Sequence, residues 1–220
     1  TLITHPALTD LVGGRENPYV FKRVEALAQA SSRPPAQLKS LSRRYRTLCG
    51  AAYPLSLVDQ SHTNIWLATY LAERFPCAKF LVLVRNPVSV AFSTTMHKGV
   101  RRWLEPPYPV PIDSGFVGNR NNIFSDYEDL SIYQKSAIRW ASHIVQTNEL
   151  IERLSPEVIR PISYEDLCSD PKVVLAEISD FLGVDDEFEM PEVDTIALEK
   201  WKQVPKSEVE NMEEIIRHYF

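Results

Sequence analysis

Short apolar runs and runs with helical spacing alternate along this chain. Residues 79–84 and 158–163 form short, mostly apolar runs, which is typical of buried strands in a parallel sheet. Pro161 lies in the second run and cannot donate to a sheet ladder, so that strand should lie at an edge or carry a bulge. A shorter apolar run at residues 55–58 predicts a further strand.

Apolar positions at helical spacing predict the helices that separate these strands. We expect helices over residues 20–30, 36–49, 64–75, 131–154, 171–182 and 207–218. Several expected ends carry suitable capping residues: Gly50 after the second helix, Asp170 and Gly183 around the fifth, and Ser207 with Glu210 as a capping box in the last.

This alternation of strand and helix predicts an α/β fold built on parallel strands. The helix between the runs at 55–58 and 79–84 is long enough to be a crossover connection, which is right-handed in nearly all proteins. A chain of 220 residues can bury one sizeable core, so we expect a single domain over residues 1–220.

Polar residues follow the expected strands where each strand ends. Arg85, His62 and Tyr164 each lie just past the end of one of them. Because the carboxyl ends of parallel strands meet at one edge of the sheet, where open α/β sheets bind ligands, these side chains should line one crevice.

The sequence RNPVSVAFS that begins at Arg85 is typical of an anion site. Asn86 is a favoured N-cap and Pro87 a favoured first helical residue, so a helix should begin directly after the arginine. Ser89 and Ser93 are four residues apart and should share one face of that helix. An arginine, a helix N-terminus and a hydroxyl group together suit a phosphate.

Residues 99–130 keep neither a helical nor a strand period. They contain four prolines and five aromatic residues. A segment of this length without regular structure is typical of a lid or a binding loop, and its aromatic content argues against disorder.

Composition narrows the partners. A net charge of −5 argues against nucleic acid, because binding its backbone requires a basic surface, although a few converging cations can still hold an anionic small molecule. No apolar run approaches the ~20 residues that span a bilayer, and no signal-peptide pattern begins at Thr1. The three widely spaced cysteines fit neither a disulfide framework nor a zinc site; they favour a reducing compartment such as the cytoplasm, with the thiols buried.

Several motifs resemble those of the PAPS-dependent sulfotransferases, which transfer a sulfuryl group from 3′-phosphoadenosine 5′-phosphosulfate to a hydroxyl or amine. Arg85-Asn86-Pro87 with Ser93 is similar to the 3′-phosphate motif of that family. The sequence from Tyr164 is similar to its YEDL…DP…FLG segment. Shorter likenesses are FPCAK at residues 75–79, Ser61-His62, and Lys200-Trp201-Lys202.

The resemblance implies a three-layer α/β/α architecture with a central parallel sheet, like that of P-loop NTPases. It implies PAPS as the donor, PAP as the product and no metal. The acceptor would be a small molecule or a glycan, bound under a lid formed by residues 99–130. His62 would be the general base, a role that suits histidine because its charge changes near neutral pH. The nucleotide-binding residues would be Arg85 and Ser93 at the 3′-phosphate, Tyr164 at the adenine, and Lys200 and Lys202 in a loop that closes over it.

Two features depart from the family pattern. Gln60 stands where many members have lysine. The phosphosulfate loop, a basic-Ser-Gly-Thr-Thr turn, is not found, and Gly13-Gly14-Arg15 does not replace it. Because Thr4-His5-Pro6 is similar to sequence that follows that loop, we expect the loop either to precede Thr1 or to be lost in this member.

These departures leave a second interpretation open, a non-catalytic nucleotide-binding or assembly module on the same fold. A kinase-type phosphoryl transferase is disfavoured, because the sequence has neither a Walker A motif nor a clear Mg²⁺-binding motif.

Overall fold

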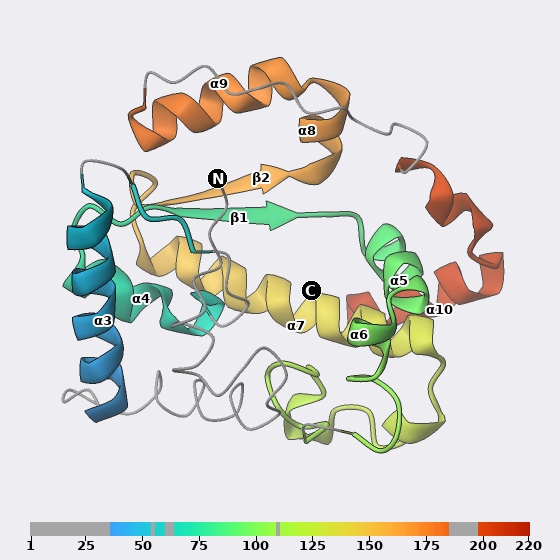
Figure 1. Cartoon of the computed structure of the whole chain (residues 1–220). Coiled ribbons are helices and arrows are strands. Elements are labelled where there is room, and N and C mark those ends of the chain that lie inside the picture. The colour runs from blue at the N-terminus through green and yellow to red at the C-terminus, as the bar shows by residue number, and fades with distance from the viewer. Residues whose placement is uncertain (1–35, 54–55, 60–63, 109–110, 185–197) are drawn as a thin grey trace. The chain divides into compact units, whose positions relative to one another are not determined.

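The computed structural model describes residues 36–53, 56–59, 64–108, 111–184 and 198–220 (Figure 1). The chain divides into two compact units, residues 1–78 and 79–220, and each is described by itself. The single domain expected over residues 1–220 stays a prediction.

The first unit contains two helices, α3 (Ala36–Ala52) and α4 (Asn64–Arg74). The Tyr70 hydroxyl joins them, because it donates to the Leu38 carbonyl at 3.1 Å and lies 2.7 Å from the Ser42 hydroxyl. Both helices were predicted, but α3 passes through Gly50 instead of ending there. The apolar side chains buried in this unit are Leu38, Leu41, Tyr45, Trp66, Leu67, Ala68 and Leu71.

The strand expected at residues 55–58 is wrong for the part that the structure describes, since residues 56–58 form no strand. Side-chain hydrogen bonds hold this stretch instead. Asp59 accepts from the Tyr45 hydroxyl and, at 3.0 Å, from the Asn64 amide. Val58 is 49% exposed. The helix expected at 20–30 lies outside the described residues.

The second unit is built on two parallel strands, β1 (Phe80–Val84) and β2 (Ile159–Ser163), which pair from Phe80–Ile159 to Val84–Ser163. Figure 1 shows α7 (Ile132–Arg153) along one side of this pair and α9 (Pro171–Leu182) along the other. The α/β fold with a parallel sheet is therefore confirmed. Within the described residues β2 has a single partner strand, which is compatible with an edge position for Pro161.

Three of the five expected helix caps are confirmed: Asn86 caps the start of α5 (Pro87–Met96), and Asp170 and Gly183 cap the two ends of α9. Ser131 and Gln134 form a capping box on α7 that was not predicted. The capping box expected at Ser207 is wrong, because α10 (Lys206–Arg217) begins directly after Pro205 and already includes that serine. The single-turn helix α8 (Tyr164–Ser169) was not predicted.

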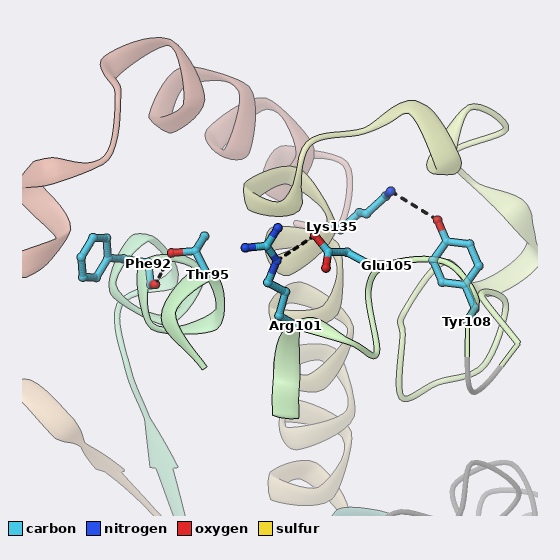
Figure 2. A network of polar contacts seen from close by, with 6 residues as sticks. All are labelled: Phe92, Thr95, Arg101, Glu105, Tyr108 and Lys135. Carbon is cyan, nitrogen blue, oxygen red and sulfur yellow. Dashed lines mark hydrogen bonds and ion pairs between the residues drawn. The ribbon is translucent and has the colours of Figure 1, made fainter. Parts of the chain in front are cut away.

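In the described part of residues 99–130, that is 99–108 and 111–130, the regular structure is limited to short helical turns, namely part of α6 (Lys98–Arg101), η1 (Arg120–Asn122) and η2 (Tyr127–Asp129). The segment packs closely on α7. Gly118 has φ +104°, and a Cβ there would lie 2.8 Å from the Ile138 carbonyl oxygen, so only glycine fits. Lys135 on α7 donates to the Glu128 carbonyl at 2.8 Å and to the Tyr108 hydroxyl at 3.3 Å (Figure 2).

The expected burial of the thiols is wrong. Cys49 and Cys77 are exposed and Cys168 is half-buried, and all three are free. The first two lie at or beyond the ends of helices and not on their buried faces. No helix in the described ranges is long and apolar enough to cross a bilayer. The same ranges hold no group of three His, Cys, Asp or Glu side chains placed to bind a metal ion.

Candidate anion-binding site

A cleft of about 170 Å³ lies beside α5 in the second unit. This volume is below the roughly 300–1,000 Å³ of pockets that enclose a whole small-molecule ligand. The cleft therefore suits one charged group of a ligand. Its lining residues are Arg85, Val90, Ser93, Thr94, His97, Val100 and Arg139.

Arg85 follows β1 directly, as predicted. Two hydrogen bonds to distant residues of the same protein fix the main chain at Arg85 and Asn86. Its carbonyl accepts from the Trp140 indole Nε1–H at 2.9 Å. The next amide, that of Asn86, donates to a Glu165 carboxylate oxygen at 2.9 Å. The Arg85 Nε is shielded from solvent and has no hydrogen-bond partner within the part of the chain described. The arginine therefore has a fixed main chain and a guanidinium with free donor capacity.

Tyr164 lies against this arginine. Because β1 and β2 end in register at Val84 and Ser163, the next residue of each strand emerges at the same edge of the sheet. The Arg85 guanidinium carbon lies 4.5 Å from the centre of the Tyr164 ring. A hydrogen bond with Cys168 and, after it, burial raise the pKa of the Tyr164 hydroxyl, while the charge of Arg85 acts in the opposite direction.

One face of α5 forms the opposite part of the lining. Val90, Ser93, Thr94 and His97 follow the spacing i, i+3, i+4, i+7 of a single helix face. Arg85 and Ser93, eight residues apart in the sequence, therefore share this cleft. Ser89, on the preceding turn, is buried and does not line it.

The N-terminus of α5 contributes less to anion binding than the sequence predicted. The Asn86 side chain accepts from the amides of Val88 at 2.9 Å and Ser89 at 3.2 Å, so the first free N–H groups of α5 are already bonded. An anion in the cleft would therefore meet side chains on the flank of α5 and not its N-terminal amides.

His97, which sequence reasoning missed, supplies a neutral donor to this lining. Its Nδ1 accepts from the Val100 amide at 3.2 Å. This bond assigns the proton of the neutral ring to Nε2, which leaves Nε2–H available as a donor.

Arg139 is the second residue that sequence reasoning missed. It comes from α7, and its guanidinium carbon lies 4.6 Å from the centre of the Phe116 ring. Its Nε is shielded from solvent without a hydrogen-bond partner in the described ranges. Burial lowers the pKa of Arg139 to about 10. The available signal was a charge between Ile138 and Ala141, inside the apolar stripe of its helix.

Of the predicted residues that the structure describes, Tyr164, Lys200 and Lys202 do not line this cleft. His62 and Gln60 lie outside the described residues. Lys200 and Lys202 lie on η4 (Lys200–Gln203), which packs against α5, but neither lines the cleft. Lys202 is exposed and forms an ion pair with Glu199 at 2.6 Å.

Comparison with known proteins places this arrangement in a family. No curated protein matches the chain. Two solved structures are similar: the sulfotransferase domain from the curacin biosynthetic pathway (22% identity, TM-score 0.53, 93% of this chain and 78% of that chain) and the sulfotransferase domain from the Synechococcus PCC 7002 olefin synthase (16% identity, TM-score 0.55, 97% and 79%). At these identities the likeness shows the fold. The family model for the sulfotransferase family matches residues 15–188, most of the chain, and the protein therefore belongs to the sulfotransferase family.

Proposed function

We propose that this protein transfers a sulfuryl group from PAPS to a hydroxyl or amine of an acceptor. The observation that carries the proposal is the cleft in which Arg85 and Ser93 meet. These residues match the family's 3′-phosphate motif in the sequence, and they line one pocket sized for a single charged group. The guanidinium would bind the phosphate through charge-assisted hydrogen bonds and the hydroxyl would add a neutral one.

The surroundings of this cleft support a nucleotide. The Tyr164 ring beside Arg85 offers an aromatic surface to the adenine. Since η4 packs against α5, Lys200 and Lys202 are on an element suited to close over the nucleotide. The ion pair of Lys202 with Glu199 is exposed, and such pairs contribute little, so it can be exchanged for a phosphate contact.

In the proposed reaction the acceptor oxygen or nitrogen attacks the sulfur of the donor. The bond between sulfur and the bridging phosphate oxygen breaks, PAP leaves with that electron pair, and the acceptor proton passes to His62. Positioning and charge stabilisation then supply most of the catalysis. The acceptor class, the cytoplasmic location and the role of residues 99–130 as an acceptor-binding lid stay predictions.

Calorimetric titration with PAP tests the donor site. We expect wild-type protein to bind PAP in the micromolar range and Arg85→Ala to bind it about 100-fold more weakly, since a charged hydrogen-bonding partner contributes roughly 1.5–3 kcal/mol. Arg153→Ala is the matched control, because Arg153 is exposed at the last turn of α7. Equal PAP affinity in wild type and Arg85→Ala would contradict the proposal.

His62→Ala tests the chemistry separately. We expect PAP release from PAPS in the presence of hydroxyl and amine acceptors to fall by about 10²–10⁴-fold, with PAP binding unchanged. A non-catalytic nucleotide-binding module is the second candidate, and Gln60 in place of the family's lysine favours it. Under that alternative the wild type binds PAP but releases none from PAPS with any acceptor.

A further inference from the structure

We infer that Arg139 is a second arginine for the 3′-phosphate of the donor nucleotide and that it binds this group together with Arg85. The inference rests on the proposed function and adds a residue that no matched motif contains. It starts from the cleft itself, which both arginines line although one follows β1 and the other comes from the middle of α7.

Among the described residues, Arg139 has neither a hydrogen-bond nor an ion-pair partner of its own. Its Nε is shielded from solvent. Its described contact is the face of Phe116, which attracts the cation weakly. Because shielding part of a charged group from water is unfavourable unless it is paired and hydrogen-bonded, this half-buried guanidinium is suited to an anion that enters from outside.

The chemistry of the cleft favours a phosphate monoester. Such a group carries a charge of about −1.5 to −2 at neutral pH and has three acceptor oxygens. Two guanidinium groups match that charge, and each can present two parallel N–H donors. The Ser93 hydroxyl and the His97 Nε2–H add neutral donors. A carboxylate, with one charge and two oxygens, would leave one guanidinium uncompensated.

The framework around Arg139 holds it ready. The Phe116 ring, over which the Arg139 guanidinium lies, packs edge-on against Trp103 at 5.1 Å between ring centres. The Phe116 carbonyl lies 3.2 Å from the His143 Nε2. The next residue on α7, Trp140, donates to the Arg85 carbonyl. Adjacent residues of one helix therefore position both arginines, which reduces the ordering that binding requires.

Two nucleotides that differ only in the 3′-phosphate test this role. PAP and 5′-AMP are titrated into wild type, Arg139→Gln, Arg139→Lys and Arg153→Gln, after thermal melts show that each variant is folded. We expect Arg139→Gln to weaken PAP binding about 10- to 100-fold and to leave 5′-AMP binding unchanged. Arg139→Lys keeps the charge but lacks the planar guanidinium, so its PAP affinity should lie between those of wild type and Arg139→Gln. Arg153→Gln makes the same change on the same helix, about 21 Å along it, and should bind as wild type does.

Other outcomes separate the inference from the proposed function. If Arg139→Gln keeps the wild-type ratio of PAP to 5′-AMP affinity, the inference is overturned and the donor site through Arg85 stands. An equal loss for both nucleotides overturns it too, since the effect is then not at the 3′-phosphate. If wild type does not bind PAP, inorganic phosphate is titrated instead. Phosphate binding that Arg139→Gln weakens keeps the two-arginine anion site and rejects PAPS as the donor, whereas no phosphate binding overturns both.

Discussion

Lys135 and Arg139 lie one turn apart on α7, and their surroundings differ in a way that separates structure from function. Lys135 is 5% exposed and fully engaged by the protein. Its ammonium donates to the Tyr108 hydroxyl (Figure 2) and to the Glu128 carbonyl. It also lies 5.4 Å from the centre of the Tyr127 ring. Arg139 faces the cleft with an unbonded Nε and rests on Phe116.

The difference shows how two cations on one helix, Lys135 buried and Arg139 half-buried, can have opposite effects on stability. Lys135 satisfies a backbone carbonyl that would otherwise lose its partner, so it anchors residues 99–130 to α7. Arg139 brings a charge into a cleft whose lining, in the part of the chain described, contains no carboxylate, which destabilises the free protein. A residue that reduces stability and lines a cleft is more readily explained by binding than by folding.

The largest expected effect is on the structural side of this comparison. We expect Lys135→Met to lower the free energy of unfolding by about 1–3 kcal/mol, because the Glu128 carbonyl and the Tyr108 hydroxyl lose their charged donor. Urea unfolding followed by circular dichroism measures this change. The PAP affinity of the folded fraction should stay at the wild-type value. A variant as stable as wild type would show that the lysine does not anchor the segment.

Arg139→Met should act in the opposite direction. Replacing a half-buried guanidinium that has no ion-pair partner among the described residues with an apolar side chain should stabilise the free protein by about 1 kcal/mol, which raises Tm by about 2–4 °C in a chain of this size. The same variant should lose most of the increase in Tm that saturating PAP gives to wild type. If Arg139→Met has a lower Tm than wild type without nucleotide, Arg139 stabilises the protein as Lys135 does, and the contrast between the two residues is lost.

The sequence predicted the elements whose signals are local. The apolar run before Arg85 and the Asn86-Pro87 start of α5 depend on neighbouring residues alone, so their positions were confirmed to within a residue. The run at 55–58 is also mostly apolar, but it is shorter and contains Ser56, and strand formation also needs a partner strand. In its described part, side chains of α3 and α4 hold the chain through Asp59 instead.

The candidate site was predictable in part for the same reason. Arg85, Ser93 and Tyr164 belong to two short motifs at strand ends, and the pairing of parallel strands brings the motifs together. Arg139 belongs to neither motif. It reaches the cleft because α7 packs against α5, which carries most of the lining. Such contacts between distant segments leave no fixed spacing in the sequence.

The smallest expected effect is a change with pH in the stability difference between wild type and Arg139→Met. Burial lowers the pKa of Arg139 to about 10 from the ordinary 12.5, while burial raises the pKa of the neighbouring Tyr127 hydroxyl, which therefore stays neutral in the same range. Because the unfolded chain holds the Arg139 proton more tightly than the folded protein does, wild-type stability gains from this group as pH rises through 10.

Arg139→Met lacks this titration, so its advantage in Tm should be complete at about pH 7.5 and smaller at about pH 10.5. Thermal melts of both proteins at the two pH values give the difference directly, and comparing the two proteins cancels the titration of groups that they share. Saturating PAP should abolish this decrease of the Tm difference at high pH, because a bound phosphate favours the charged guanidinium and raises its pKa. If the Tm difference between the two proteins without nucleotide does not change with pH, the charge of Arg139 does not destabilise the folded protein. The comparison with Lys135 would then rest on binding alone.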